Sequence, residues 1–547
     1  MSERVSMSFD KYVTFLELTD YLQETAREYP GLSSLESAGK SYEGRDIWAM
    51  TLTNWATGEP DKKPAIYIDG NIHAGEVTGS AVALYLIHYL VTNFGLDDEV
   101  THLMNTRTFY VLPRVNPDGA ELYLTSPTAL RSSVRVWPDE EICDLPGLHR
   151  ADVNGDGKIL QMRVRDDQKG EWKVSQKDPR LMIPRRPGER KGPFYRFYPE
   201  GFIKDYEGEP IPINRTPFGL DLNRNFPSNW DTEVPGGGDY PTAEPEPRAI
   251  LDFIIKHPNI GAVQALHTSG GFYYRNPCQY PEDKMDPDDL RATKDIAREG
   301  TVCSGYPDMK SPNRSTLTEW AYEHRGLIAY TTELWNRYSR AGIDLVDFRT
   351  TVDPDKKEDM QVKLLVWNDR ELAGKGFVPW TPFDHPQLGQ VEIGGWDAKF
   401  CVQNPPPSLL KQECHRNTIW ILRHASALPE IHMAPIEITV LDGTARKVTA
   451  VVENHGYLPT NITNRAKAAG VVKNDVFRIA PGLGMTVVGQ AKHEIEFIEG
   501  YMNGQGDRPA KSTARASWII QAEPGATGRI EFRSQRGGTV GRDFQVT

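Results

Sequence analysis

Strand-like and helix-like segments alternate along most of the first 430 residues of this 547-residue chain, and this alternation constrains the fold more than any other feature. Apolar strand-like runs occur at 46–54, 64–70, 107–116, 261–270 and 326–335, and helical periodicity occurs at 14–30, 78–95 and 244–258. Alternation of this kind is typical of an α/β domain with a largely buried sheet.

Three segments depart from the alternation. Residues 137–215 are rich in Pro, Gly and charge and predict a long surface insertion. Residues 344–428 look mostly helical and are expected to pack on the same domain. After Pro429, short alternating strands separated by Gly, Asn and Asp predict a β-sandwich. We therefore expect a catalytic domain over 1–430 and a β-sandwich over 431–547 whose role the sequence does not define.

Composition limits the classes of binding partner and the cellular compartment that we expect for this protein. A net charge of −12 argues against nucleic acid or an anionic membrane as the primary partner. The N-terminus lacks the apolar run of a signal peptide, and no other run is long enough to span a bilayer. The five cysteines form no CxxC pair, which favours reduced thiols and a cytoplasmic protein; they are Cys143, Cys278, Cys303, Cys401 and Cys414.

A His and a Glu lie three residues apart directly after the strand-like run 64–70. His73 and Glu76 therefore fall between a strand and a helix, at the carboxyl end of the sheet, where α/β proteins place their sites. His267 ends another apolar strand. Two His and one carboxylate form a catalytic zinc set, with the fourth position left for water. The alternative is a polar turn that leads into the helix.

Five motifs then follow in a fixed order along the chain. They are H-x-x-E at 73–76, N-P-D-G at 116–119, N-R-N-F at 223–226, a strand ending in His-Thr at 267–268, and T-x-E-L at 331–334. As a set they resemble the zinc metallocarboxypeptidases, the carboxypeptidase A-like family. The resemblance runs from about Tyr12 to Trp335, apart from the insertion, and does not cover the β-sandwich. It implies a mixed-sheet catalytic domain, bound Zn2+, and hydrolysis of the C-terminal bond of peptides with a free C-terminus.

The same resemblance implies a role for each motif residue. His73, Glu76 and His267 become zinc ligands, and Glu333 becomes the general base that activates zinc-bound water and then carries the proton to the leaving amine. For Glu333 the alternative is a salt bridge at a strand end.

Arginines and an asparagine complete the implied site. Arg131 lies twelve residues after the N-P-D-G motif, where the family has an Arg that stabilises the oxyanion; Arg135 is a nearby rival. Asn223 and Arg224 match the pair that grips the substrate's terminal carboxylate, a task that suits a planar guanidinium.

The sequence departs from the family pattern at three positions. Gly75 replaces an Arg that often precedes the Glu ligand, and Ser311 aligns with a mobile capping Tyr. Thr318, neither acidic nor apolar, occupies the position that sets side-chain preference, and Arg314 would favour an acidic terminal residue unless it is simply solvated. Three tyrosines are candidates to replace the cap: Tyr273, Tyr274 and Tyr306.

A second cation site is suggested inside the insertion. Asp152, Asn154 and Asp156 have the D-x-N-x-D-G spacing of a calcium loop, and Asp166 or Asp167 would close the shell. The twelfth position is Arg163 rather than Glu, so the loop is not a proper EF-hand. The alternative is a turn built from Asx and Gly residues.

Two other functions compete with the peptidase. One is a zinc amidase or deacylase of the aspartoacylase type, which shares the His-x-x-Glu and distant His arrangement. The other is a non-catalytic peptide-binding protein on the same scaffold. The N-P-D-G and N-R-N-F motifs together with Glu333 favour the peptidase. The sequence does not define the preferred C-terminal residue, the physiological substrate or the oligomeric state.

Overall fold

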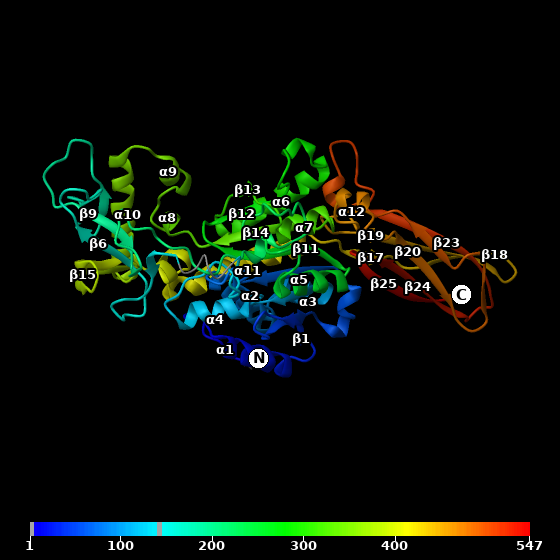
Figure 1. Cartoon of the computed structure of the whole chain (residues 1–547). Helices are drawn as coiled ribbons and strands as arrows, with labels where there is room; N and C mark the ends of the chain where they lie inside the picture. The colour runs from blue at the N-terminus through cyan, green and yellow to red at the C-terminus, as the bar shows by residue number, and fades with distance from the viewer. Residues whose placement is uncertain (1–4, 139–144, 547) are drawn as a thin grey trace.

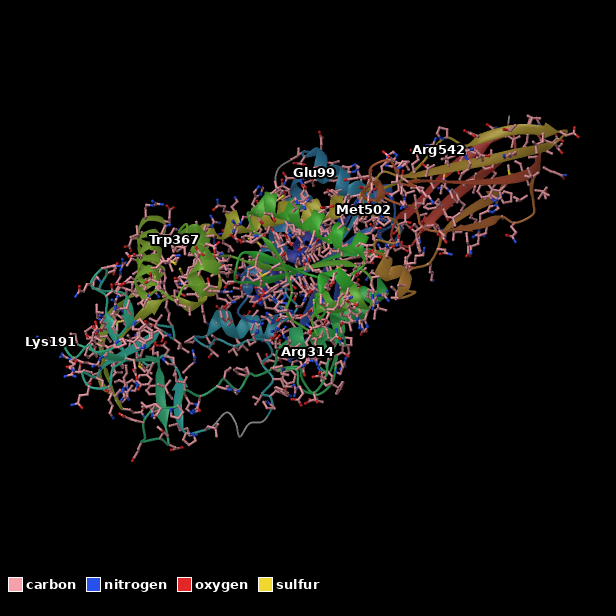
Figure 2. All side chains as sticks on the ribbon, turned by 90° about the horizontal axis from the view of Figure 1, so that it is seen from above. Glu99, Lys191, Arg314, Trp367, Met502 and Arg542 are labelled. Carbon is pink, nitrogen blue, oxygen red and sulfur yellow. The ribbon has the colours of Figure 1, made fainter. Side chains whose placement is uncertain are left out.

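The protein is elongated, with a central α/β body between two β-rich parts (Figure 1). The structure, a computed structural model, describes residues 5–138 and 145–546. Lys191 in the insertion and Arg542 near the C-terminus lie at opposite ends of the molecule (Figure 2).

An eight-stranded mixed sheet forms the centre, in the order β1-β2-β4-β3-β11-β14-β12-β13. Its strands are β1 (Ser33–Lys40), β2 (Asp46–Leu52), β3 (Ala65–Gly70), β4 (Thr108–Leu112), β11 (Ile260–Thr268), β12 (Phe272–Arg275), β13 (Asp308–Lys310) and β14 (Ile328–Leu334). The neighbours β4, β3, β11 and β14 are parallel, whereas β1, β2 and β12 add antiparallel pairs. The predicted α/β class with a mixed sheet is confirmed.

Helices cover both faces of this sheet. Side chains alternate along β3, so that Ile66 and Ile68 join one apolar core while Ala65 and Tyr67 join the other. The first core includes α2 (Val77–Asn93), α6 (Pro287–Ser304) and α11 (Pro407–Ser426), and the second includes α5 (Pro245–Lys256) and α7 (Leu317–Glu323). Other helices are α1 (Phe15–Glu28), α3 (Asp98–Thr106) and α4 (Pro117–Thr125).

The insertion is an ordered lobe that shares a sheet with a distant segment. Strands β6 (Gln161–Arg165), β7 (Trp172–Val174), β8 (Met182–Pro184) and β9 (Tyr195–Pro199) join β15 (Phe377–His385) and β16 (Gly389–Trp396) in a six-stranded sheet. A second pair is β5 (Gly147–Arg150) with β10 (Gly201–Lys204), and α10 (Pro354–Leu372) lies beside the lobe (Figure 1).

The prediction of a mostly helical segment over 344–428 is wrong for residues 377–396. This stretch forms the hairpin β15–β16, and β16 pairs antiparallel with β6 of the insertion. The pairing supplies backbone hydrogen bonds and a small apolar core that includes Met162, Val391 and Ile393.

The C-terminal part consists of two antiparallel sheets, as predicted for a β-sandwich. One contains β17 (Ile431–Met433), β18 (Glu437–Asp442), β19 (Ala445–Asn454), β21 (Met485–Val488) and β23 (Thr513–Ala522), and the other β20 (Asp475–Pro481), β22 (Lys492–Ile495), β24 (Thr527–Ser534) and β25 (Gly538–Gln545). Val448 and Ile520 of the first sheet share a core with Phe477 and Phe532 of the second. Buried Arg536 donates hydrogen bonds to the carbonyls of Arg325 and Gly326 and so ties this part to the central body.

No single helix among residues 5–138 and 145–546 has the length and apolarity needed to cross a bilayer; α2 and α3 meet those criteria only as a pair bent by 102°. The described cysteines are all free, namely Cys278, Cys303, Cys401 and Cys414, and Cys143 lies outside the described residues.

Candidate metal centre and active site

Three adjacent parallel strands carry the candidate site at their carboxyl ends. His73 lies in the loop after β3, His267 is near the end of β11, and Glu333 is near the end of β14. His267 and Glu333 are direct register partners across β11 and β14. Because parallel strands end at one edge of a sheet, residues far apart in sequence meet there.

Two glycines allow the loop after β3 to turn tightly into α2. A Cβ on Gly70 would lie 2.5 Å from the Gly79 carbonyl carbon, and a Cβ on Gly79 would lie 2.6 Å from the Leu266 oxygen. The helix therefore starts in direct contact with the strand ends. Glu76 is the N-cap residue of α2, and its amide donates to the His73 carbonyl at 3.0 Å, which closes the turn between the two side chains.

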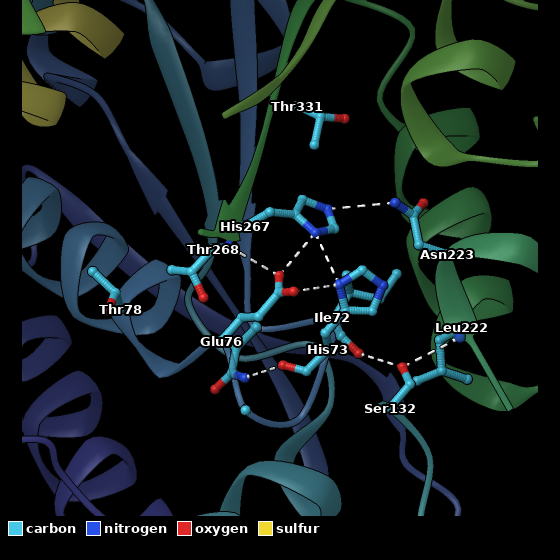
Figure 3. A network of polar contacts seen from close by, with 12 residues as sticks. Ile72, His73, Glu76, Thr78, Ser132, Leu222, Asn223, His267, Thr268 and Thr331 are labelled. Carbon is cyan, nitrogen blue, oxygen red and sulfur yellow. Dashed lines mark hydrogen bonds and ion pairs between the residues drawn. The ribbon is translucent and has the colours of Figure 1, made fainter. Parts of the chain in front are cut away.

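His73, Glu76 and His267 converge on one point and are all buried (Figure 3). One Glu76 oxygen lies 2.9 Å from His73 Nδ1 and the other lies 2.9 Å from His267 Nδ1, while the two Nδ1 atoms are 3.0 Å apart. Among the described residues this is the one group of three or more His, Cys, Asp or Glu ligand atoms, all within 4.8 Å of one another. Two imidazoles and one carboxylate form a donor set that suits zinc.

The remaining ring nitrogens of both histidines contact polar side chains. Asp221 Oδ1 lies 3.0 Å from His73 Nε2, and Asn223 Nδ2 lies 3.4 Å from His267 Nε2. Asp221 can accept the Nε2 hydrogen of His73 and so leave its Nδ1 free to face Glu76, as in the carboxylate–histidine–metal triads of metalloenzymes. Burial alone would raise the pKa of Asp221, but His73 and Arg131 hold it well below its ordinary value, so the carboxylate stays charged.

Asp221 is a residue of the candidate site that the sequence analysis missed. It lies two residues before Asn223, and its carboxylate also caps the short helix that carries Asn223 and Arg224 by accepting from the Asn223 amide at 2.9 Å. The only available signal was an acidic residue beside the N-R-N-F motif, which alone does not distinguish a helix cap from a partner of a metal ligand.

We expect Asp221→Asn to lower zinc affinity by roughly 10–100-fold, because the substitution keeps the side-chain size but removes the charge that orients His73. Competition with a chromophoric chelator measures this change. Asp231→Asn is the matched control, because Asp231 pairs only with exposed Arg314 among the described side chains. Equal zinc affinity in the Asp221 variant and the wild type would contradict the role of Asp221.

Arg131, rather than Arg135, reaches the centre. Its guanidinium donates to Glu76 at 3.2 Å and to Asp221 at 3.2 Å. Arg135 instead pairs with buried Glu244 at 2.6 Å and with Asp239 at 3.3 Å. Of the two arginines, only Arg131 contacts the group formed by His73, Glu76 and His267.

Glu333 lies beside the centre with its carboxyl poised to hold a proton. Burial, followed by repulsion from the Glu76 carboxylate, raises the pKa of Glu333 to about 8, while His73 and Arg131 oppose the rise. A carboxyl group with a raised pKa in a closed site can accept and return a proton near neutral pH.

Asn223 contacts the ring nitrogen of His267 that faces away from Glu76, and Arg224 is the next residue in the chain. Arg224 donates to the Asn223 carbonyl at 2.8 Å and to Asn313 Oδ1 at 3.0 Å, and its charge lowers the pKa of Glu333. The Asn223 side-chain oxygen accepts from the Leu317 amide at 3.0 Å. Asn223 is therefore engaged in positioning, whereas the half-buried Arg224 retains donors for a ligand.

The Tyr123 ring explains the absence of a side chain at Gly75. A Cβ on Gly75 would lie 2.8 Å from the Tyr123 ring, so any larger residue would displace this tyrosine. Tyr123 is buried and packs on Ala74 and Val77 next to the metal centre.

One of the three candidate capping tyrosines, Tyr274, lies outside the core. Tyr273 and Tyr306 are buried, and their hydroxyls bond to Gly300 and Glu413 respectively in the core. Tyr274 points to the opposite side of β12, packs against Phe272 with ring centroids 4.7 Å apart, and has its pKa raised by burial and by Glu333. It is half-buried, whereas the other two are buried.

The remaining positions considered for substrate specificity, Ser311, Thr318 and Arg314, have polar partners within the protein. Ser311 is buried and its amide donates to the Arg275 carbonyl, and Thr318 is buried with its hydroxyl 3.1 Å from that of Thr331. Arg314 pairs with Asp231 at 2.6 Å on the surface.

The Asp152 loop has the hydrogen bonds of an Asx/Gly turn. Asp152 accepts from the amides of Gly155 and Gly157, Asn154 accepts from the Asp156 amide, and Asp156 accepts from the Lys158 amide. Asp166 and Asp167 are likewise engaged, with Lys169 and Arg165 respectively. These carboxylates stabilise local turns, and the calcium prediction finds no support.

Comparisons with known proteins agree with this geometry. Residues 18–347 match the family model described as zinc carboxypeptidase, and residues 430–545 match a domain of unknown function. Carboxypeptidase A2 of Rattus norvegicus is 35% identical over 338 residues, which cover 58% of this chain and 61% of that protein. Carboxypeptidase D of Mus musculus is 41% identical over 108 residues, which cover 20% of this chain and 8% of that protein.

Solved structures show weaker likenesses. The carboxypeptidase A of Helicoverpa armigera aligns with a TM-score of 0.42 and 19% identity, covering 68% of this chain and 75% of that one. The chain spans 8% of carboxypeptidase D and 61% of carboxypeptidase A2, so neither relative is matched over two thirds of its length.

Proposed function

This chain belongs to the zinc carboxypeptidase family, and from that premise we propose that it is a metallocarboxypeptidase that removes residues from the free C-termini of peptides. The observation that carries the proposal is the convergence of His73, Glu76 and His267 at the strand ends, next to Glu333. Arg131 and Arg224 supply positive charge near this group.

His73, Glu76 and His267 would hold the zinc ion. When bound, zinc polarises a substrate carbonyl and lowers the pKa of a coordinated water to ~7. The donor set fits this role because both imidazoles present Nδ1 to one point and Asp221 can accept the Nε2 hydrogen of His73.

Glu333 is the proton carrier in this proposal. Its carboxylate accepts a proton from the attacking water as the new C–O bond forms, and the carboxyl then donates this proton to the amine nitrogen as the C–N bond breaks. Arg131 donates hydrogen bonds to the oxygen that becomes negative in the tetrahedral intermediate. Arg224 binds the terminal carboxylate, which restricts cleavage to chain ends.

Mass spectrometry of a diverse peptide mixture incubated with the zinc-loaded protein tests the reaction directly. Stepwise loss of C-terminal residues is the expected result and would also reveal the preferred terminal residue. An unchanged mixture, despite one bound zinc per chain, would contradict the proposal and favour a small amide substrate or a binding protein.

We expect Arg224→Ala to lower kcat/KM for peptides with a free C-terminus by roughly 10–100-fold, the effect of one charge-assisted hydrogen-bond pair of about 1.5–3 kcal/mol. Turnover of C-terminally amidated peptides, already slow, should change much less. The measurement is kcat/KM for matched free and amidated peptides. Arg314→Ala is the control, because Arg314 is engaged with Asp231 on the surface. Equal losses on both peptides would refute the carboxylate contact.

A further inference from the structure

A cavity of about 950 Å³ begins at Arg131 and extends between the central body and the insertion lobe. Its walls come from the end of α4, from β5, from the loop before β6, and from the turn that precedes α11. Arg131 lines the cavity, whereas Asn223, Arg224 and Glu333 do not. The cavity therefore lies on the Arg131 side of the metal centre, away from the residue proposed to bind the terminal carboxylate.

The charged side chains that line this cavity are predominantly positive. Among its described lining residues, the charged ones are Arg131, Arg150, Lys158, Arg215, Lys399 and the single carboxylate Asp397. This excess contrasts with the net charge of −12 for the whole chain. Walls of one sign around a concave space concentrate the electrostatic potential and attract ligands of the opposite sign.

Two of these cations, Arg150 and Arg215, remain available to a ligand. Lys158 is paired with Asp397 at 2.5 Å, and Lys399 donates to the backbone carbonyls of Tyr123 and Ser126 at 2.6 Å. Arg150 and Arg215 are exposed, and no carboxylate within 5–138 or 145–546 forms an ion pair with either. Two guanidiniums that have no carboxylate partner among the described residues can each bind a ligand carboxylate in a bidentate way.

We infer that this cavity binds acidic residues upstream of the scissile bond, so that the preferred substrates are peptides with Glu or Asp before the residue that is removed. The inference rests on the proposed function. With the terminal carboxylate at Arg224 and the scissile carbonyl at Arg131, the rest of the peptide continues from Arg131 into the cavity. Its acidic side chains then meet Arg150 and Arg215.

The test uses three N-terminally blocked peptides that share a cleavable C-terminal dipeptide and carry three Glu, three Gln or three Lys residues before it. We expect kcat/KM to fall in the order Glu, Gln, Lys, with Glu favoured over Gln by about tenfold at low ionic strength. The preference should shrink as salt is added. Equal values for the Glu and Gln peptides would overturn the inference while leaving the peptidase proposal intact.

Variants locate the effect in the cavity. The double variant Arg150→Gln/Arg215→Gln should bring the Glu-to-Gln ratio close to one without changing kcat/KM for the Gln peptide. Arg190→Gln, an exposed arginine of the same lobe outside the cavity lining, should retain the wild-type ratio. An unchanged ratio in the double variant would overturn the inference.

A binding measurement tests this inference independently of the proposed reaction. Fluorescence anisotropy of labelled tri-Glu and tri-Gln peptides with the zinc-loaded protein requires no turnover. Tighter binding of the tri-Glu peptide, lost in the double variant, would support the acidic-peptide cavity even if no peptide were cleaved. Equal binding of both peptides would count against it.

Discussion

Glu333→Gln is expected to lower kcat by roughly 10²–10⁴-fold, the usual contribution of a general acid–base group. The amide matches the carboxylate in size but neither accepts the proton from water nor delivers it to the leaving amine. Zinc content should stay at the wild-type level, because Glu333 is not among the three converging ligand residues. Steady-state kinetics on the best peptide from the digest, together with metal analysis, measure both quantities.

Glu246→Gln is the matched control for this substitution. Glu246 is buried, burial raises its pKa to about 7, and its carboxylate accepts from the Tyr42 amide at 2.9 Å. Like Glu333 it has a raised pKa, but it has no place among the converging ligand residues. Wild-type activity in the Glu246 variant would show that neutralising a buried carboxyl is harmless by itself, and a Glu333 variant with intact kcat would refute the proton-carrier role.

Arg131→Gln should lower kcat by roughly 10²–10³-fold, as observed when one preorganised oxyanion donor is removed from an enzyme. The effect should appear mainly in kcat, because the arginine contributes most where negative charge develops on the carbonyl oxygen. Rates are best expressed per bound zinc, since Arg131 also contacts Glu76 and Asp221.

Arg135→Gln tests the alternative assignment. Since Arg135 pairs with buried Glu244, its loss is expected to lower the unfolding temperature while leaving kcat per bound zinc near the wild-type value. A larger fall in kcat for the Arg135 variant than for the Arg131 variant would reverse the two roles.

The convergence of His73, Glu76 and His267 was largely predictable because it depends on a general rule of sheet geometry. His73 and His267 each follow an apolar run, and parallel strands bring such positions together at one edge. The order of the motifs then indicated Glu333, which the structure places as the register partner of His267. Asp221 was missed because its contact with His73 joins positions 148 residues apart, and no local pattern encodes it.

Side-chain orientation and long-range strand pairing account for the other differences between the sequence predictions and the structure. Three tyrosines were equivalent in sequence, and the alternation of β12 decides that Tyr274 rather than Tyr273 turns away from the core. The hairpin β15–β16 was missed although Pro379, Pro382 and Pro386 disfavour a helix there. Its pairing partner, β6, lies more than 200 residues before β16 and gives no local signal.

The sheet shared between β6 and β16 has a consequence for the nascent chain. During synthesis from the N-terminus, β6 emerges with one edge unpaired until β16 is made, which happens only after β14, the last strand of the central sheet. An unpaired edge invites association between chains, and inward or edge-placed charges discourage it. Arg163 and Arg165 supply such charges on β6. Once β16 arrives, Arg163 pairs with Glu392 through contacts of 2.8 and 3.0 Å, so the residue that protects the open edge also helps to close it.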